Sequence, residues 1–283
     1  YLNMLMEVIF MDKKYIDLHV HSTASDGTLT PTEVVKLAAS EGLSAIALTD
    51  HDTIDGIKEA MSVAGEYGIE LIPGIEFSTA YEKREVHMLG LFIDPDNYAL
   101  NEKLNELVAT RDNRNEQMAA NLRNAGIDIT IPALTEMFPD AIITRAHFAR
   151  YMYEKGYIKD IRLAFDKYIG DGRPCYVRRE KISAKEVIDL IKNAGGIPIL
   201  AHPLLYGFNE RELKECVATL TRTGLVGIEA IYSKNKGLDE SKVRAVAKAN
   251  SLLISGGSDF HGANKPGLNI GTGYGHLAIP YEI

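Results

Sequence analysis

Residues 15–22 read YIDLHVHS, and this stretch decides how the rest of the chain is interpreted. Its β-branched and apolar start predicts a strand over residues 15–18. Because side chains alternate across an extended backbone, His19 and His21 point to the same side and can chelate one cation. Taken alone, a His-x-His pair is equally typical of polar residues on a solvated strand. The residues that accompany the pair therefore decide between the two interpretations.

From residue 15 onward, β-branched runs alternate with helical patterns, which is typical of βα units around a parallel sheet. Thr30, Pro31 and Glu33 form the start signature of the first helix, and Gly42 follows its end. The fold class that we predict is therefore α/β. The seven strands that we predict lie at residues 15–18, 45–48, 70–72, 86–92, 197–201, 226–231 and 252–255.

The alternation lapses between residues 94 and 179, where Leu100, Leu104 and Leu107 fall at helical spacing. We therefore expect a helical insertion at residues 99–179 within a barrel built from residues 15–98 and 180–283. An insertion at the face that carries the βα loops lies beside the active site, so this one is a candidate lid and substrate domain. Residues 1–14 are expected to form an N-terminal extension, which either precedes a natural start at Met11 or adds a strand or helix.

The composition argues against several classes of protein. The chain has 283 residues, of which 46% are hydrophobic, so it can bury a sizeable core. Cys175 and Cys216 have no CxxC spacing, which argues against a disulfide framework and fits a reducing cytoplasm. The net charge of -8 disfavours a stable nucleic-acid partner but allows a small anionic substrate. The apolar N-terminal stretch lacks a basic leader and is too short to span a membrane, so we expect a cytoplasmic protein.

Candidate metal ligands follow most of the predicted strands. His51 lies between two aspartates after the strand at 45–48, and Asp259 and His261 follow a glycine pair. Because strand ends converge on one face of a βα barrel, these side chains are expected to gather there. Imidazole combined with carboxylate suits zinc, manganese or iron. The further candidates at strand ends are Glu76, His87 and His202.

Five segments together resemble the polymerase and histidinol phosphatase family, usually called PHP. They are DLHVHSTASDGTLTP at 17–31, LTDHDT at 48–53, GIEFS at 74–78, AHP at 201–203 and SDFH at 258–261. The resemblance extends from residue 15 to about residue 269. Within the family, the stand-alone phosphatases that act on nucleoside monophosphates or 3',5'-bisphosphates are the most similar branch. The resemblance implies a distorted seven-stranded βα barrel with a helical insertion.

The resemblance also implies two or three divalent cations. Glu76 would bridge the first two ions, and the third position contains Asp26 where some relatives carry histidine. Asp50 and Asp52 are expected to orient imidazoles rather than to bind metal. The ligand sets that the resemblance implies are His19, His21, Glu76 and Asp259 for the first ion, Glu76, His87 and His202 for the second, and Asp26, His51 and His261 for the third.

The insertion contains TRAHF at residues 144–148, which also matches the family. On residue type alone, Arg145 is typical of a solvated helix, but the resemblance implies that it meets substrate phosphate, for which a planar bidentate donor is well suited. His147 is assigned as a substrate contact, with metal-facing and packing roles as alternatives. Tyr176 and Lys181 belong to a basic stretch that is more typical of solvated surface, and Glu229 has no matching role.

These features predict a metal-dependent phosphohydrolase that releases phosphate from a small monoester, a nucleotide resembling AMP or a 3',5'-bisphosphate. A hydroxide that bridges two ions would attack phosphorus, with Glu76 and Arg145 as catalytic residues. One alternative is a 5'-3' exonuclease on short oligonucleotides, and another is a non-catalytic regulatory module that binds metal. Amidohydrolases also build metal sites from His-x-His, but no strand-end lysine takes the bridging place of Glu76.

Overall fold

The computed structural model of the chain describes residues 14–139, 141–178 and 181–283. The predicted N-terminal extension, except for residue 14, lies outside the described residues. Within the described part, seven strands form one sheet in the order of the sequence. They are β1 Tyr15–Val20, β2 Leu43–Leu48, β3 Glu70–Tyr81, β4 Arg84–Leu91, β5 Ile197–Leu200, β6 Gly227–Tyr232 and β7 Leu253–Gly257.

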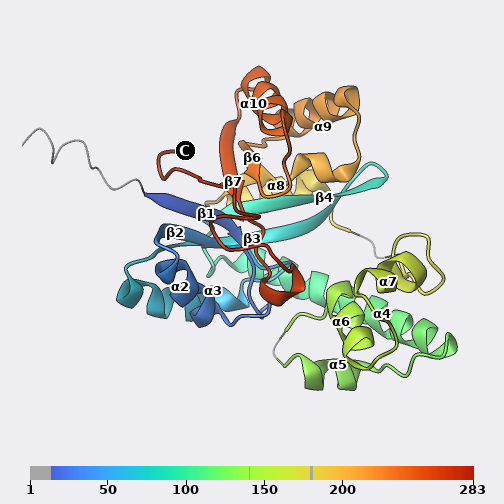
Figure 1. Cartoon of the computed structure of the whole chain (residues 1–283). Helices are drawn as coiled ribbons and strands as arrows, with labels where there is room; N and C mark the ends of the chain where they lie inside the picture. Colours follow the sequence, from blue (N-terminus) through green and yellow to red (C-terminus); the bar gives the residue numbers. More distant parts are fainter. Residues whose placement is uncertain (1–13, 140, 179–180) are drawn as a thin grey trace, which may run out of the picture.

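The first and last strands approach each other and nearly close the sheet into a barrel (Figure 1). The His21 N–H donates to the Phe260 carbonyl at 2.9 Å, and the Asp259 N–H donates to the His19 carbonyl at 2.8 Å. These bonds place the residues that follow β7 directly beside β1. The predicted α/β class and the distorted seven-stranded barrel are confirmed.

The expectation of a parallel sheet is wrong at β4, which pairs antiparallel with both β3 and β5. The reason is the connection, because Glu82 and Lys83 alone join β3 to β4 and a parallel crossover needs a dozen or more residues. β3 is also much longer than the predicted strand at 70–72, since it continues through Pro73 and Gly74 to Tyr81. This length allows Glu76 to be carried within a strand.

Helices cover the barrel on its outer sides (Figure 1). The predicted first helix is confirmed as α2, where Thr30 and Glu33 form a capping box. Its apolar face packs in one buried cluster with β1 and β2 residues, including Val34, Val20 and Ile46. The barrel helices are α2 Pro31–Ser40, α3 Asp55–Ala64, α8 Ala184–Asn193, α9 Glu210–Arg222 and α10 Asp239–Ala249, with short turns η1 Gly65–Tyr67, η3 Pro203–Tyr206 and η4 Gly262–Asn264.

The remaining helices lie to one side of the barrel (Figure 1). They are α4 Tyr98–Asn124, α5 Ile131–Met137, α6 Arg145–Glu154, α7 Arg162–Ala164 and the π-helical turn η2 Phe165–Ile169. Leu100 and Leu104 of α4 belong to a barrel core cluster, whereas Met118 and Leu122 belong to a separate cluster with α5 and α6. We therefore propose that the predicted insertion is a helical unit with its own core, joined to the barrel through α4.

Within the part of the chain that the structure describes, no helix combines the length and apolar character needed to cross a bilayer.

Candidate metal centre

The predicted ligands converge at one end of the barrel, although they come from most of its strands. Glu76 lies within β3 and is fully buried, and backbone bonds tie it to the loop after β2. Its N–H donates to the Asp50 carbonyl at 3.1 Å, and its carbonyl accepts the Asp52 N–H at 3.0 Å. The other predicted ligands around it are His19, His21, Asp26, His51, His87, His202, Asp259 and His261.

One oxygen of Glu76 faces the first predicted ligand set. Its Oε2 lies 3.2 Å from Nε2 of His19 and 3.2 Å from Nε2 of His21. Asp259 completes the set, because its Oδ1 lies 3.6 Å from Nε2 of His19 and 3.4 Å from Nε2 of His21. The structure thus brings together all four side chains that the sequence assigned to the first ion.

The other oxygen of Glu76 faces the second set. Its Oε1 lies 2.8 Å from Nδ1 of His87 and 2.9 Å from Nε2 of His202. His51 also approaches, with Nδ1 at 3.1 Å from Oε2 of Glu76, and the structure groups His51 with Glu76 and His87. A carboxylate whose two oxygens face different imidazole groups is able to bridge two cations, and bridging is the role that the family resemblance implies for Glu76.

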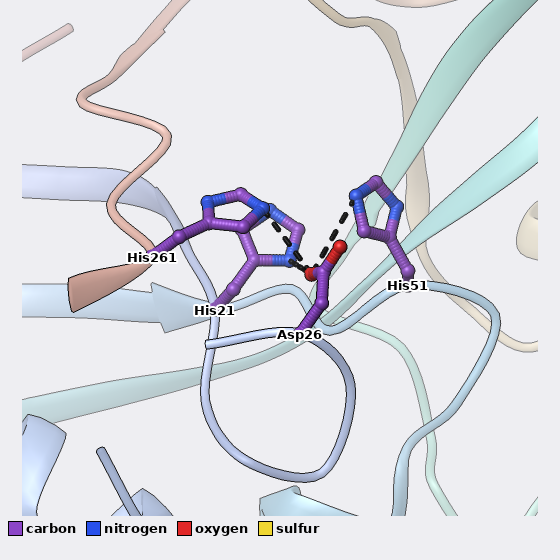
Figure 2. Close-up of side chains that lie close together, drawn as sticks. All are labelled: His21, Asp26, His51 and His261. Atoms are coloured by element: carbon purple, nitrogen blue, oxygen red, sulfur yellow. Dashed lines mark ion pairs between the residues drawn. The ribbon is translucent and has the colours of Figure 1, made fainter. Parts of the chain in front are cut away.

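The third set surrounds Asp26 (Figure 2). Its Oδ1 lies 3.2 Å from Nε2 of His261 and 3.9 Å from Nε2 of His51. The structure adds His21, whose Nδ1 lies 4.0 Å from the same oxygen. The sequence assigned His21 to the first ion alone, whereas its two ring nitrogens face two different sets.

Unpaired polar atoms show that these residues fit cations. Nε2 of His19, both ring nitrogens of His21, Nδ1 of His51 and Oε2 of Glu76 are buried and make no hydrogen bond within the described residues. Buried polar groups in folded proteins nearly always have a partner. Metal ligands are expected to have this arrangement, in which nitrogen and oxygen atoms lie close together and make no hydrogen bonds.

Burial lowers the pKa of His51 and His261, whereas nearby carboxylates raise the pKa of His21 and His87. Burial lowers the pKa of His21, but the nearby carboxylates of Asp259 and Glu76 outweigh burial and raise the pKa to about 9. Burial also opposes a charge on His87, yet Glu76 and Glu85 raise its pKa to about 10. The protons that these histidines retain at neutral pH must leave when a cation binds, so metal binding is coupled to proton release.

The aspartates that flank His51 contact neighbouring segments of the chain. The Asp50 carboxylate accepts the Ser22 N–H at 2.8 Å and the Ser25 hydroxyl at 2.6 Å, so it holds the loop that carries Asp26. Asp52 accepts the Ser78 N–H at 2.9 Å and forms an ion pair with Arg111 of α4. Asp50 thus connects the loop after β2 to the loop after β1, and Asp52 connects the same loop to β3 and α4.

A cavity of about 270 Å³ adjoins the centre. Asp26, His51 and His87 line one end of it, and Arg145 lines the wall contributed by α6. Arg145 is partly exposed, its Nη2 lies 3.6 Å from Oε2 of Glu85, and its guanidinium lies 5.6 Å from the ring centroid of Tyr176. The further lining residues, which the sequence analysis did not assign to the site, include Glu85, Arg111, Arg114, Phe165, Tyr176 and Lys181.

His147 is not among the residues that line this cavity. It is 3% exposed, and its Nδ1 accepts the Thr144 N–H at 2.9 Å within the capping box of α6. A hydrogen bond to the Ser25 backbone links it to the loop that carries Asp26. The substrate contact that the sequence assigned to His147 stays a prediction, while the observed contacts are those of a helix cap.

Comparisons with other proteins agree with this geometry. The PHP domain family matches residues 17–196. The chain is 39% identical over 251 residues to a 5'-3' exoribonuclease of Haemophilus influenzae, covering 89% of this chain and 91% of that one. It is 36% identical over 257 residues to a 3',5'-nucleoside bisphosphate phosphatase of Chromobacterium violaceum, covering 90% of each.

Two solved structures share the whole architecture. A Chromobacterium violaceum protein described as an amidohydrolase, with bound sulfate and no metal, has a TM-score of 0.84 and 37% identity, covering 91% of this chain and 90% of that one. A candidate metal-dependent phosphoesterase of Bifidobacterium adolescentis has a TM-score of 0.84 and 30% identity, covering 94% and 93%. The chain therefore belongs to the PHP domain family of metal-dependent phosphoesterases.

Proposed function

We propose that the chain releases phosphate from a small nucleotide that carries a phosphate monoester, such as AMP or a 3',5'-bisphosphate. The observation that carries this proposal is the cavity, in which Asp26, His51 and His87 lie at one end and Arg145 and Lys181 lie in the wall. Its volume of about 270 Å³ suits a small ligand. Basic side chains and candidate metal ligands that line one small cavity favour a compact anionic substrate.

Each group has a role that follows from its position. Glu76, with His19, His21, His87, His202 and Asp259, would hold two ions, and a third ion would use Asp26, His51 and His261. Bound divalent ions supply Lewis-acid activation of water and of phosphoryl oxygens. Arg145 can donate two parallel N–H bonds to phosphate oxygens as negative charge develops on them. Phe165 and Tyr176 line the same cavity, and their rings can contact a base.

A second candidate function is 5'-3' exoribonuclease activity on short oligonucleotides. It is favoured by the Haemophilus influenzae relative and by a second cavity of about 880 Å³. This cavity shares Glu85, Tyr176 and Lys181 with the first, and Lys83, Arg84 and Arg178 also line it. Further nucleotides of a bound strand would have basic side chains beside their phosphates.

Substrate length separates the two candidates. The manganese-loaded protein would be assayed for phosphate release from AMP and from a 3',5'-bisphosphate, and for shortening of 5'-phosphorylated oligoribonucleotides of increasing length. We expect kcat/KM to be highest for a mononucleotide and to fall as nucleotides are added. Values that rise with length would reject the phosphatase in favour of the exoribonuclease.

The assay needs a variant that removes the centre without a change in shape. Glu76→Gln is nearly isosteric and should abolish both activities, since a neutral amide cannot replace a carboxylate that faces five imidazoles. Glu66→Gln, at an exposed position in η1, is the matched control and should keep full activity. Activity that survives Glu76→Gln would come from a contaminant or from a different site.

A further inference from the structure

Glu229 lies in β6 behind the candidate metal centre and is fully buried. Its Oε1 lies 2.9 Å from Nδ1 of His19, and its Oε2 accepts the backbone N–H of His202 at 2.7 Å. One carboxylate therefore contacts two candidate ligands that come from opposite parts of the sequence. The sequence pattern assigned Glu229 no functional role.

The contact with His19 determines which ring nitrogen carries a proton. A carboxylate can only accept a hydrogen bond, so Nδ1 of His19 must be the donor. In the neutral ring, the form that binds metal, the lone pair is then on Nε2, which lies 3.2 Å from Oε2 of Glu76 and makes no hydrogen bond within the described residues. Metal binding needs that lone pair, and an acceptor behind the other nitrogen is the usual way to provide it.

The contact with His202 fixes the orientation of the carboxyl group. His202 has φ 23°, in the left-handed region that few residues other than glycine adopt. Its N–H cannot rotate away, and Oε2 of Glu229 is its acceptor. This bond stabilises a strained backbone at the point where the His202 side chain turns toward Oε1 of Glu76.

We propose that Glu229 is a positioning residue that sets the tautomer of His19 and thereby the metal affinity of the first ligand set. The inference rests on the proposed metal centre but not on which phosphoester the chain hydrolyses. Glu229 acts through His19 and His202, since its two oxygens are the atoms that contact them.

Glutamine at this position gives a sharp prediction. The His202 N–H requires an acceptor, so the amide oxygen of Glu229→Gln must take the place of Oε2. The NH₂ group then faces Nδ1 of His19 as a donor, which moves the lone pair to Nδ1 and the proton to Nε2. The substitution keeps the size of the side chain and moves the lone pair of His19 away from Nε2, where metal binding needs it.

The experiment measures zinc affinity by competition with a chromophoric chelator at neutral pH, without any phosphate substrate. For Glu229→Gln we expect zinc binding at the first ligand set to weaken by about 10–100-fold, the usual effect of removing an outer partner of a ligating histidine. Glu229→Asp keeps a carboxylate that can only accept, so it should bind zinc more tightly than Glu229→Gln despite its shorter side chain. Glu66→Gln is the surface control.

A packing role for Glu229 predicts the reverse order, because glutamine preserves shape and aspartate does not. Zinc affinity that is unchanged in Glu229→Gln, or weaker in Glu229→Asp than in Glu229→Gln, would overturn the proposal. In the zinc-loaded protein with ¹⁵N-labelled histidine, the proton of His19 should reside on Nδ1, and this signal should be lost in Glu229→Gln. If the wild-type protein binds no zinc through His19, the proposed metal centre fails instead, which is a separate result.

Discussion

Replacement of His147 by glutamine should remove a pH-dependent part of the stability while preserving the α6 cap. His147 is at the third helical position and accepts the Thr144 N–H, as glutamine does in many capping boxes. Burial lowers the pKa of His147 from 6.5 to about 4. The unfolded chain therefore takes up a proton near pH 6.5, whereas the folded protein resists protonation until about pH 4.

The sign and size follow from these two values. The stability that a neutral His147 provides is fully present above pH 6.5 and is lost as the pH falls toward 4. At about 1.4 kcal/mol for each pH unit between 6.5 and 4, the contribution to the free energy of unfolding falls by about 3 kcal/mol. Glutamine does not titrate, so the variant should lack this loss.

The assay is urea unfolding of wild type and His147→Gln, both with chelator, at pH 7 and at pH 4. The difference in unfolding free energy between the two proteins should shift by about 3 kcal/mol in favour of the variant at pH 4. A difference that is the same at both pH values would refute the reasoning. Steady-state kinetics of the metal-loaded His147→Gln variant at pH 8 test whether His147 contacts substrate. A substrate contact predicts a large rise in KM, whereas a helix cap predicts little change.

Two further substitutions test the cavity wall and the closure of the barrel. Arg145→Ala should lower kcat/KM by about 10–100-fold, equivalent to about 1.5–3 kcal/mol for hydrogen bonds to a charged group. Arg145→Lys should have a kcat/KM between those of wild type and Arg145→Ala, because lysine cannot bind in a bidentate manner. Equal kcat/KM in all three proteins would contradict the assignment. Gly257→Ala would place a Cβ in steric conflict with Cβ of His19, so it should cost about 1–3 kcal/mol of stability and reduce bound zinc. Gly65→Ala, with open space around it, is the control, and full zinc content in Gly257→Ala would show that β1 and β7 separate easily.

The clustering of the candidate ligands could be predicted from the sequence because their signal is local. Most of them follow or lie in an apolar run, as His19 does in β1 and His202 does after β5, and strand ends must converge in a barrel. The antiparallel β4 was missed because β-branched runs look the same in either direction. Only the short link through Glu82 and Lys83 indicates that β4 runs antiparallel to β3. This link was not recognised because β3 is much longer than the predicted strand at 70–72.

The surroundings of the ligands were harder to predict, since they depend on contacts between distant segments. Glu229 reads as a strand residue, and its contact with His19 spans 210 positions of the chain. Arg111 has the spacing of a helix residue, and only the path of α4 past the barrel brings it to Asp52. Sequence patterns report local periodicity, whereas charge pairs of this kind are set by tertiary packing.

We propose that the separation of barrel and helical insertion allows substrate preference to change while the candidate metal centre is kept. The ligands come from the barrel and from the loops at its rim, while much of the cavity wall comes from α4, α6 and the segment around Tyr176. The bonds that join the two parts at the site include the Ile142 N–H to the Ala24 carbonyl at 3.2 Å and the ion pair of Arg111 with Asp52. Changes in the helical wall can therefore alter which phosphoester fits while Glu76 and its histidines stay in place, so substrate preference should follow the residues beside Arg145 more closely than the ligands themselves.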